Sequence, residues 1–226
     1  MERDKCKVES VNVEAGTWKQ VLKCEGEPVL SFTLRWPKLP EDSTAFRRIG
    51  RYYQYAADRW RTRWETCLFA SACEELKRAR EQSFPFRPWE AALDFTVTYN
   101  EKGLFSLYMD AYEFTGGAHG NTVRCGDAWD LNSGMPCTLP MFFPHGSRWR
   151  WESIAAVRTE IERQIATGDY MYLDGWYQAA AKEFDPCRFY LTDQGATVFY
   201  PLYSLAPYVE GFPAFVVAPW PEENCT

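Results

Sequence analysis

The feature that most constrains the fold is a long helical repeat of apolar residues in the first half of the chain. Glu41-Asp42-Ser43 supplies N-cap chemistry before it, and the pattern continues to about Gln82. The prolines of the segment 83–88, SFPFRP, end it because each disfavours helix in the residue before it. Steps of three and four place these residues on one buried face: Phe46, Ile49, Tyr53, Ala56, Trp60, Trp64, Cys67 and Ser71.

The other face of this helix is charged. Its first half is rich in arginine, including Arg47, Arg48 and Arg51. Such a face is most often a solvated surface, and it is also compatible with binding to an acidic partner.

Extended segments precede the helix. Lys7–Glu14 and Thr17–Cys24 read as two strands, with Ala15-Gly16 as a hairpin turn between them. In Pro28–Trp36 apolar residues alternate with polar ones, which predicts a strand with one buried face.

Beyond the helix, strands and helices alternate. Asn100–Gly103 and Asn132–Gly134 have turn composition, and Gly168 is a C-cap candidate. The expected strands are Glu90–Tyr99, Leu104–Phe114, Thr122–Leu131, Arg188–Thr192, Ala196–Tyr200 and Ala214–Val217; Thr138–Phe143 is a short apolar segment, and helices are expected at Trp151–Ala166 and Trp176–Phe184. The sequence predicts an α+β fold with mainly antiparallel sheet, divided into a small domain at residues 1–88 and a second domain at 89–226.

Charge and hydropathy restrict the partners. A net charge of −6 and a pI near 5.1 argue against a general nucleic-acid binder, which needs a basic face. The sequence has no tract of 18 apolar residues, and its first residues are charged where a signal peptide has its apolar core. These features predict that the chain has no membrane span. The expected location is the cytoplasm by default, or the cell surface if an anchor has been removed. The features leave the oligomeric state open.

The eight cysteines lie at positions 6, 24, 67, 73, 125, 137, 187 and 225. They are enough for four disulfides, but they are scattered and form no CxxC pair. We therefore expect reduced, mostly buried thiols and no metal site.

The most distinctive stretch is a glycine-rich corner between two strand-like runs, DAYEFTGGAHGNTVRCG at Asp110–Gly126. His119 in this corner is a candidate general base, with Asp110, Glu113 and Asp127 nearby to orient it. No nucleophile motif accompanies it, and the corner matches neither a phosphate-binding loop nor a cofactor motif. The alternative is a structural role. The glycines then supply positive φ and allow close approach of the backbone, and the imidazole hydrogen-bonds to the strand ends and so stabilises the corner.

Ten tryptophans and thirteen tyrosines make aromatic recognition a further hypothesis, and Tyr203–Tyr208 is a candidate exposed aromatic loop. We assign no catalytic residue, metal ligand or cofactor. The candidate ligand-binding residues, from the corner and this loop, are Tyr112, Thr115, Gly116, Gly117, His119, Gly120, Asn121, Tyr203, Pro207 and Tyr208.

Several motifs in consistent order carry a family resemblance. They are YEFTGGAHGNT at Tyr112–Thr122, WDLNSG at Trp129–Gly134, TLPMFF at Thr138–Phe143 and FYLTDQGATVFYPLYSLAPYVEGF at Phe189–Phe212. Together they resemble the C-terminal domain of unknown function of RsiV-type anti-sigma factors and PdaC-type peptidoglycan deacetylases, over residues 89–218. Residues 5–85 resemble the small companion domain that commonly precedes it.

The resemblance implies an α+β module of the cell envelope that is not itself the enzyme. RsiV-like members bind lysozyme, and PdaC-like members carry their chemistry in a separate deacetylase domain. This sequence shows neither a sigma-binding segment nor deacetylase metal ligands. We therefore predict a non-catalytic module that binds a protein or a cell-wall ligand, with a hydrolase using His119 or an intracellular regulatory domain as alternatives.

Overall fold

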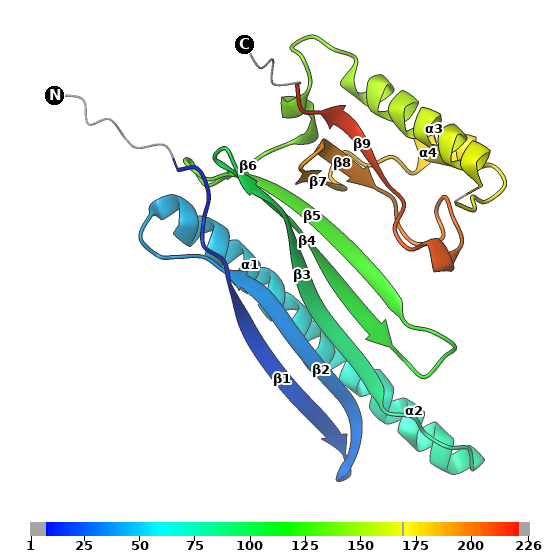
Figure 1. The fold of residues 1–226 in the computed structure, drawn as a ribbon. Helices are drawn as coiled ribbons and strands as arrows, with labels where there is room; N and C mark the ends of the chain where they lie inside the picture. The colour runs from blue at the N-terminus through cyan, green and yellow to red at the C-terminus, as the bar shows by residue number, and fades with distance from the viewer. Residues whose placement is uncertain (1–7, 169, 222–226) are drawn as a thin grey trace. The chain divides into compact units, whose positions relative to one another are not determined.

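The computed structural model describes residues 8–168 and 170–221 and confirms a mixed α+β fold (Figure 1). A six-stranded sheet has the order β1-β2-β3-β4-β5-β6, and a three-stranded sheet has the order β7-β8-β9. The strands are β1 (Glu14–Cys24), β2 (Glu27–Lys38), β3 (Trp89–Glu101), β4 (Leu104–Phe114), β5 (Asn121–Asp130), β6 (Met135–Pro136), β7 (Phe189–Thr192), β8 (Gly195–Phe199) and β9 (Ala214–Pro219). The α-helices are α1 (Thr44–Arg63), α2 (Phe69–Gln82), α3 (Trp149–Thr167) and α4 (Trp176–Lys182).

The chain forms two compact units. Val11–Thr96 and Met109–Arg124 make up one, which we call the N-terminal unit. Residues 8–10, Val97–Tyr108 and the described residues from Cys125 onward make up the other, the C-terminal unit. Strands β3, β4 and β5 contribute residues to both. The predicted domain boundary after residue 88 stays a prediction.

The first hairpin of the N-terminal unit differs from the predicted one. Ala15 and Gly16 lie inside β1, opposite Pro37 and Trp36 of β2, and the turn is instead at Glu25-Gly26, where both residues have positive φ (52° and 87°). Gly16 serves close packing: a Cβ there would lie 2.3 Å from the Trp36 ring. Of the predicted strand from Lys7 to Glu14, only Glu14 is in β1, and Lys7 lies outside the described residues.

One long helical segment runs through α1, a π-helical turn at Trp64–Leu68, and α2. Its start is as predicted, because the Ser43 hydroxyl accepts the Phe46 N–H at 3.0 Å. It ends at Ser83, which adopts left-handed φ of 55°. The helix then leads into β3, which pairs in parallel with β2, and a parallel pair needs a crossover of this kind.

The buried face of this helix differs from the predicted face at several positions. Tyr53 and Trp64 are buried as predicted, but Ala57, Leu68 and Ala72 are buried where Ala56, Cys67 and Ser71 were expected, and Trp60 is half-buried. The π turn adds a residue to one turn and so accounts for the shift at Leu68 and Ala72, which follow Trp64, but not for the one at Ala57.

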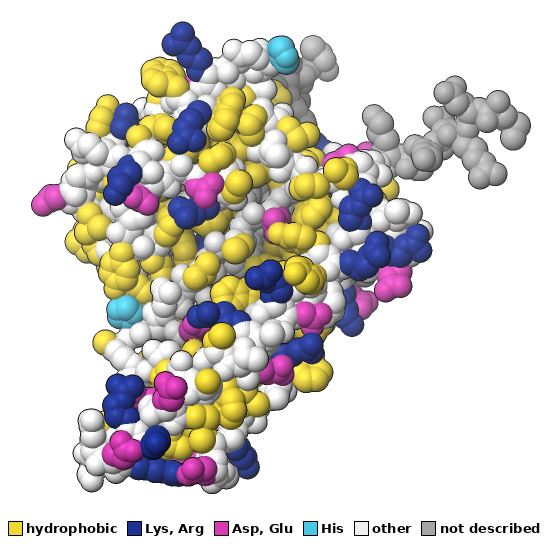
Figure 2. Space-filling model, turned by 180° about the vertical axis from the view of Figure 1, so that it is seen from behind, with side chains coloured by type: hydrophobic (Ala, Val, Ile, Leu, Met, Phe, Trp, Pro, Cys, Tyr) yellow, Lys and Arg dark blue, Asp and Glu magenta, His cyan; other side chains and the backbone are white. Residues whose placement is uncertain are grey.

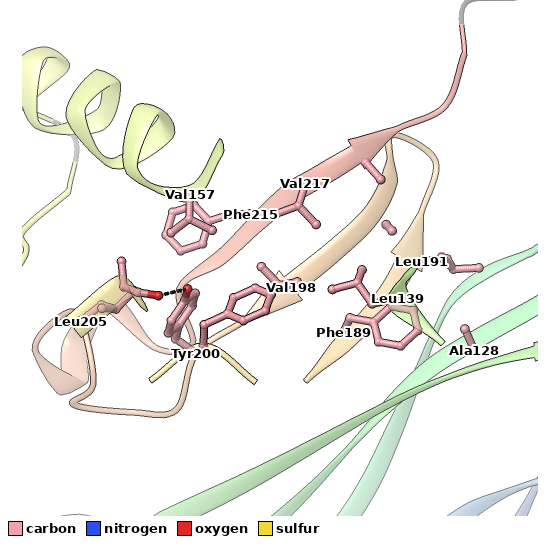
Figure 3. Packing of buried hydrophobic residues seen from close by; sticks show 14 of the residues in the cluster. Ala128, Leu139, Val157, Phe189, Leu191, Val198, Tyr200, Leu205, Phe215 and Val217 are labelled. Atoms are coloured by element: carbon pink, nitrogen blue, oxygen red, sulfur yellow. Dashed lines mark hydrogen bonds between the residues drawn. The ribbon is translucent and has the colours of Figure 1, made fainter. Parts of the chain in front are cut away.

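The C-terminal unit packs α3 and the antiparallel strands β7, β8 and β9 around one core (Figure 3). Val157 of α3 lies beside Phe215 of β9, and both are buried. The Tyr200 hydroxyl donates to the Ala180 carbonyl at 2.7 Å, which ties the end of β8 to α4. The predicted C-cap at Gly168 is confirmed by its φ of 74°, and the apolar segment 138–143 forms a 3-10 helix at Leu139–Phe142.

Candidate functional site

The glycine-rich corner connects β4 to β5 within the N-terminal unit, and two of its glycines have structural roles. Gly116 has a φ of 85°. A Cβ on buried Gly120 would lie 2.2 Å from the Tyr112 ring, so only glycine lets the chain pass this ring. Gly117 has neither feature, since the nearest atom to its Cβ position is 3.8 Å away.

His119 is exposed at the tip of this corner. Its Nδ1 lies 2.9 Å from the Gly120 carbonyl oxygen. Asp110, one of the carboxylates expected to orient it, instead accepts two hydrogen bonds from Arg124 at 2.8 and 2.7 Å. A catalytic dyad of His119 with Asp110 therefore has no support in these contacts.

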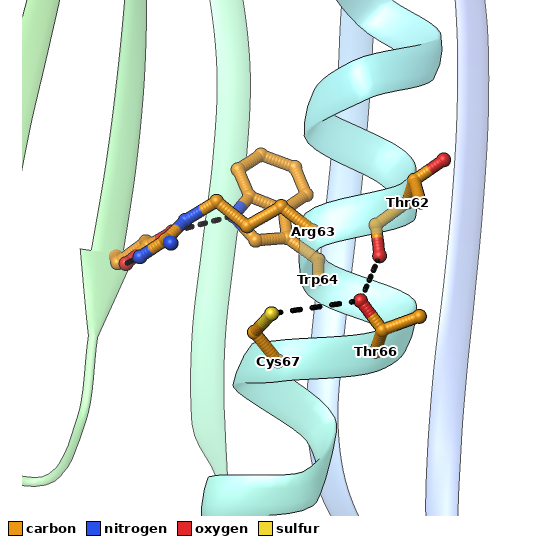
Figure 4. Close-up of polar contacts among 6 residues, drawn as sticks. Thr62, Arg63, Trp64, Thr66 and Cys67 are labelled. Carbon is orange, nitrogen blue, oxygen red and sulfur yellow. Dashed lines mark hydrogen bonds and ion pairs between the residues drawn. The ribbon is translucent and has the colours of Figure 1, made fainter.

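Glu113, the second expected carboxylate, is bound by Arg63 and Trp64, two side chains that Figure 4 shows beside the π turn. Arg63 donates to its two oxygens at 2.8 and 3.1 Å, and the Trp64 indole donates to one of them at 2.8 Å. Burial alone would raise the pKa of Glu113, but the hydrogen bonds from Arg63 and Trp64 and the Arg63 charge together hold it below the ordinary value. The residue thus fixes the helix to β4, a role that the sequence pattern did not reveal.

Ser106 of β4, a serine near the corner in sequence, is fully buried in the C-terminal unit. It donates to the Asp127 carbonyl at 2.7 Å and accepts the Leu191 N–H at 2.8 Å. Such a side chain bridges strands and is not available as a nucleophile.

The C-terminal unit carries an exposed apolar surface that includes the predicted Tyr203–Tyr208 loop. Two segments form it, and two hydrogen bonds join them. The Leu173 N–H donates to the Leu205 carbonyl at 2.8 Å, and the Met171 N–H donates to the Glu210 carboxylate at 3.2 Å. We call it the aromatic surface and define it by Tyr170, Met171, Leu173, Tyr203, Tyr208 and Val209. Five of these are exposed, from 37% for Leu173 to 76% for Val209, and Tyr208 is half-buried.

Two features give this surface a defined shape. The Tyr203 and Tyr208 rings pack with centroids 5.6 Å apart. Tyr203 has a φ of 62°, a left-handed conformation that is rare for a bulky residue and that occurs where the surrounding structure enforces it. In this conformation the Tyr203 side chain is 53% exposed and is available for contact.

The predicted ligand-binding residues therefore fall into two groups. Thr115, Gly117 and Asn121 are exposed at the corner of the N-terminal unit, together with Gly116 and His119. Tyr203, Tyr208 and Pro207, which precedes the short 3-10 helix Tyr208–Glu210, lie in the C-terminal unit. Sequence reasoning missed Tyr170, Met171, Leu173 and Val209, because the segment YMYLD at 170–174 has no helical or strand period.

Six cysteines are described, and all are free thiols. The expectation of mostly buried thiols is wrong, since only Cys137 is buried and Cys67, Cys125 and Cys187 are exposed. Burial raises the pKa of Cys137 to about 11, so it is protonated at neutral pH. Cys6 and Cys225 lie outside the described residues.

Two kinds of site are absent from the part of the chain that the structure describes. They contain no group of three or more histidine, cysteine or acidic side chains arranged to hold a metal ion. None of the described helices has the length and apolar character needed to cross a membrane.

Comparison with known proteins gives two family matches. Residues 24–122 match a family described as deacetylase PdaC, and residues 152–219 match a protein family of unknown function, DUF3298. The corner lies in the first matched segment, and the aromatic surface lies in the second. No match was found among curated proteins.

Two solved structures share the fold. A DUF3298 family member from Bacteroides fragilis is 14% identical, covers 93% of this chain and 91% of its own, and has a TM-score of 0.61. A DUF3298 family protein from Pseudomonas aeruginosa is 20% identical with the same coverage and a TM-score of 0.57. The chain thus carries a segment that matches the PdaC family followed by a segment that matches DUF3298, as its sequence motifs indicated.

Proposed function

We propose that this protein is a non-catalytic binding module that recognises a partner through the aromatic surface of its C-terminal unit. The observation that carries this proposal is the exposure of five large apolar side chains on two hydrogen-bonded segments. Large apolar side chains exposed on two joined segments are a mark of interaction sites on folded proteins.

The composition of the surface favours a protein or a cell-wall saccharide as partner. Tyrosine rings give large contact areas at a low cost in conformational entropy and can stack on the apolar faces of sugar rings. Glu210 and Asp174, next to the apolar residues, give the rim negative charge. An acidic rim suits a basic protein, and the resemblance to RsiV-type proteins suggests lysozyme as the first one to test.

Isothermal titration calorimetry with lysozyme and with soluble peptidoglycan fragments tests the proposal. We expect heat of binding with one of them, and a loss of at least tenfold in affinity for Tyr203→Ala combined with Val209→Ser. Met135→Ser, an exposed apolar residue of β6 in the same unit, is the matched control and should bind like the natural chain. Absence of heat with both ligands would remove both as partners, and equal losses in the control would show that the aromatic surface is not the site.

A further inference from the structure

A second site lies in the N-terminal unit, where α1 begins. A pocket of about 400 Å³ is lined there by Trp36, Lys38, Leu39, Glu41, Phe46, Arg47, Gly50, Arg51 and Gln54. Its apolar side is formed by buried Trp36, Leu39 and Phe46, and its rim is formed by exposed charged side chains. Figure 2 shows Lys and Arg side chains gathered over the first half of α1.

The rim carries an excess of positive charge on an otherwise acidic chain. Lys38, Arg47 and Arg51 face a single carboxylate, Glu41, whereas the whole chain has a net charge of −6. Arg47 donates to Thr44 and Arg51 to the Arg47 carbonyl, each at 3.3 Å, and in the described part of the chain neither forms an ion pair. Their guanidinium groups therefore retain donors for an outside acceptor.

Trp36 closes the inner, apolar side of the pocket and is only 9% exposed. Its indole nitrogen is buried against Gly16 of β1, 2.7 Å from the position that a Cβ would take there. The ring therefore offers the pocket an apolar contact.

Gly50 keeps the pocket open. It lies in the interior of α1, where glycine is unfavourable relative to other residues, and the nearest atom to its Cβ position is the Leu39 nitrogen at 4.0 Å. A side chain at this position would therefore fit the helix and occupy the pocket.

From these observations we infer that the pocket binds a small organic carboxylate with an apolar body, such as an acylated amino acid or the C-terminal end of a peptide. Paired guanidinium groups bind carboxylates through charge-assisted hydrogen bonds, and Trp36 and Phe46 provide the contact for the apolar part. Glu41 on the rim disfavours a doubly charged phosphate more strongly than a singly charged carboxylate.

Calorimetry with N-acetyl-leucine, leucinamide and inorganic phosphate tests this assignment. N-acetyl-leucine should bind, while leucinamide, which has no carboxylate, and phosphate, which has no apolar body, should bind at least tenfold more weakly. Arg47→Gln combined with Arg51→Gln should lower the affinity for N-acetyl-leucine at least tenfold, and the control Arg48→Gln, on the same helix outside the pocket, should change it less than twofold.

Gly50→Leu separates pocket blocking from misfolding. It should abolish N-acetyl-leucine binding while thermal stability stays the same or rises, because leucine favours helix over glycine. The inference is overturned if N-acetyl-leucine gives no heat, if phosphate or leucinamide binds equally well, if Arg48→Gln has the same effect as the double variant, or if Gly50→Leu binds normally.

Discussion

At the scale of single residues, neighbouring glycines of the corner have different roles. A Cβ at Gly120 would lie 2.2 Å from the Tyr112 ring, whereas at Gly117 it would meet nothing closer than 3.8 Å. We expect Gly120→Ala to lower the free energy of unfolding by about 1–3 kcal/mol, because an aromatic ring has to shift. The matched variant Gly117→Ala should stay within about 0.5 kcal/mol of the natural chain. Urea unfolding compares the two, and equal effects would contradict the packing role of Gly120.

His119 lies between these two glycines on the sequence and is exposed, with Nδ1 2.9 Å from the Gly120 carbonyl. We expect His119→Ala to lower stability by about 0.5–1.5 kcal/mol, the usual contribution of one hydrogen bond. Thermal and urea unfolding measure this loss. A variant with unchanged stability that had lost a hydrolytic activity would instead support the catalytic alternative.

Glu113 makes stability depend on pH with a defined sign. Its pKa in the folded chain is below the ordinary value of 4.5, so its ionised form is stabilised by folding. The stabilisation is present above the ordinary pKa and is lost as the pH falls through the lowered one. The stability difference between the natural chain and Glu113→Gln should therefore be largest at pH 6–7 and shrink toward about pH 3. Urea unfolding over this range checks it, and a difference that does not change with pH would contradict the charged contact with Arg63.

At the scale of secondary-structure elements, Ser106 connects three strands of the C-terminal unit. Its hydroxyl donates to β5 at Asp127 and accepts the Leu191 N–H of β7. Ser106→Ala leaves that N–H buried without a partner, so we expect a loss of about 1–3 kcal/mol. Ser153→Ala is the control, because this equally buried hydroxyl only donates to the Trp149 carbonyl of its own helix, at 2.8 Å. Equal losses of stability in the two variants would show that the hydrogen bonds of Ser106 between strands contribute nothing beyond the burial of its hydroxyl.

Local patterns predicted most elements. The Ser43 cap, the alternation in β2, the hairpin between β3 and β4, and the Gly168 cap all follow from a few adjacent residues. The wrong predictions lie where a residue far away in the sequence determines the local structure. Gly16 looks like a turn residue, but its small size is required by Trp36 on the next strand. The π turn at Trp64–Leu68 is similar, since the apolar period alone does not show where one extra residue enters the helix.

At the scale of the whole molecule, sequence order predicted two successive domains, and that division stays a prediction. The two compact units each combine separate segments of the chain. Strands β3, β4 and β5 each contribute residues to both. The two groups of candidate binding residues are correspondingly placed in different units. The aromatic residues of the sequence identified the Tyr203–Tyr208 loop, but no local pattern shows that Leu173 donates to the Leu205 carbonyl and Met171 to the Glu210 side chain.

The central claim is that the aromatic surface of the C-terminal unit is the binding site. Hydrogen-exchange mass spectrometry tests it most directly, with and without whichever of lysozyme and peptidoglycan fragments gives heat of binding, since contact protects backbone amides from exchange. We predict slower exchange at residues 170–173 and 203–210 and no change in the peptides of α1 and α2. Unchanged exchange at both segments in the presence of the saturating ligand, or protection confined to other parts of the chain, would contradict the claim.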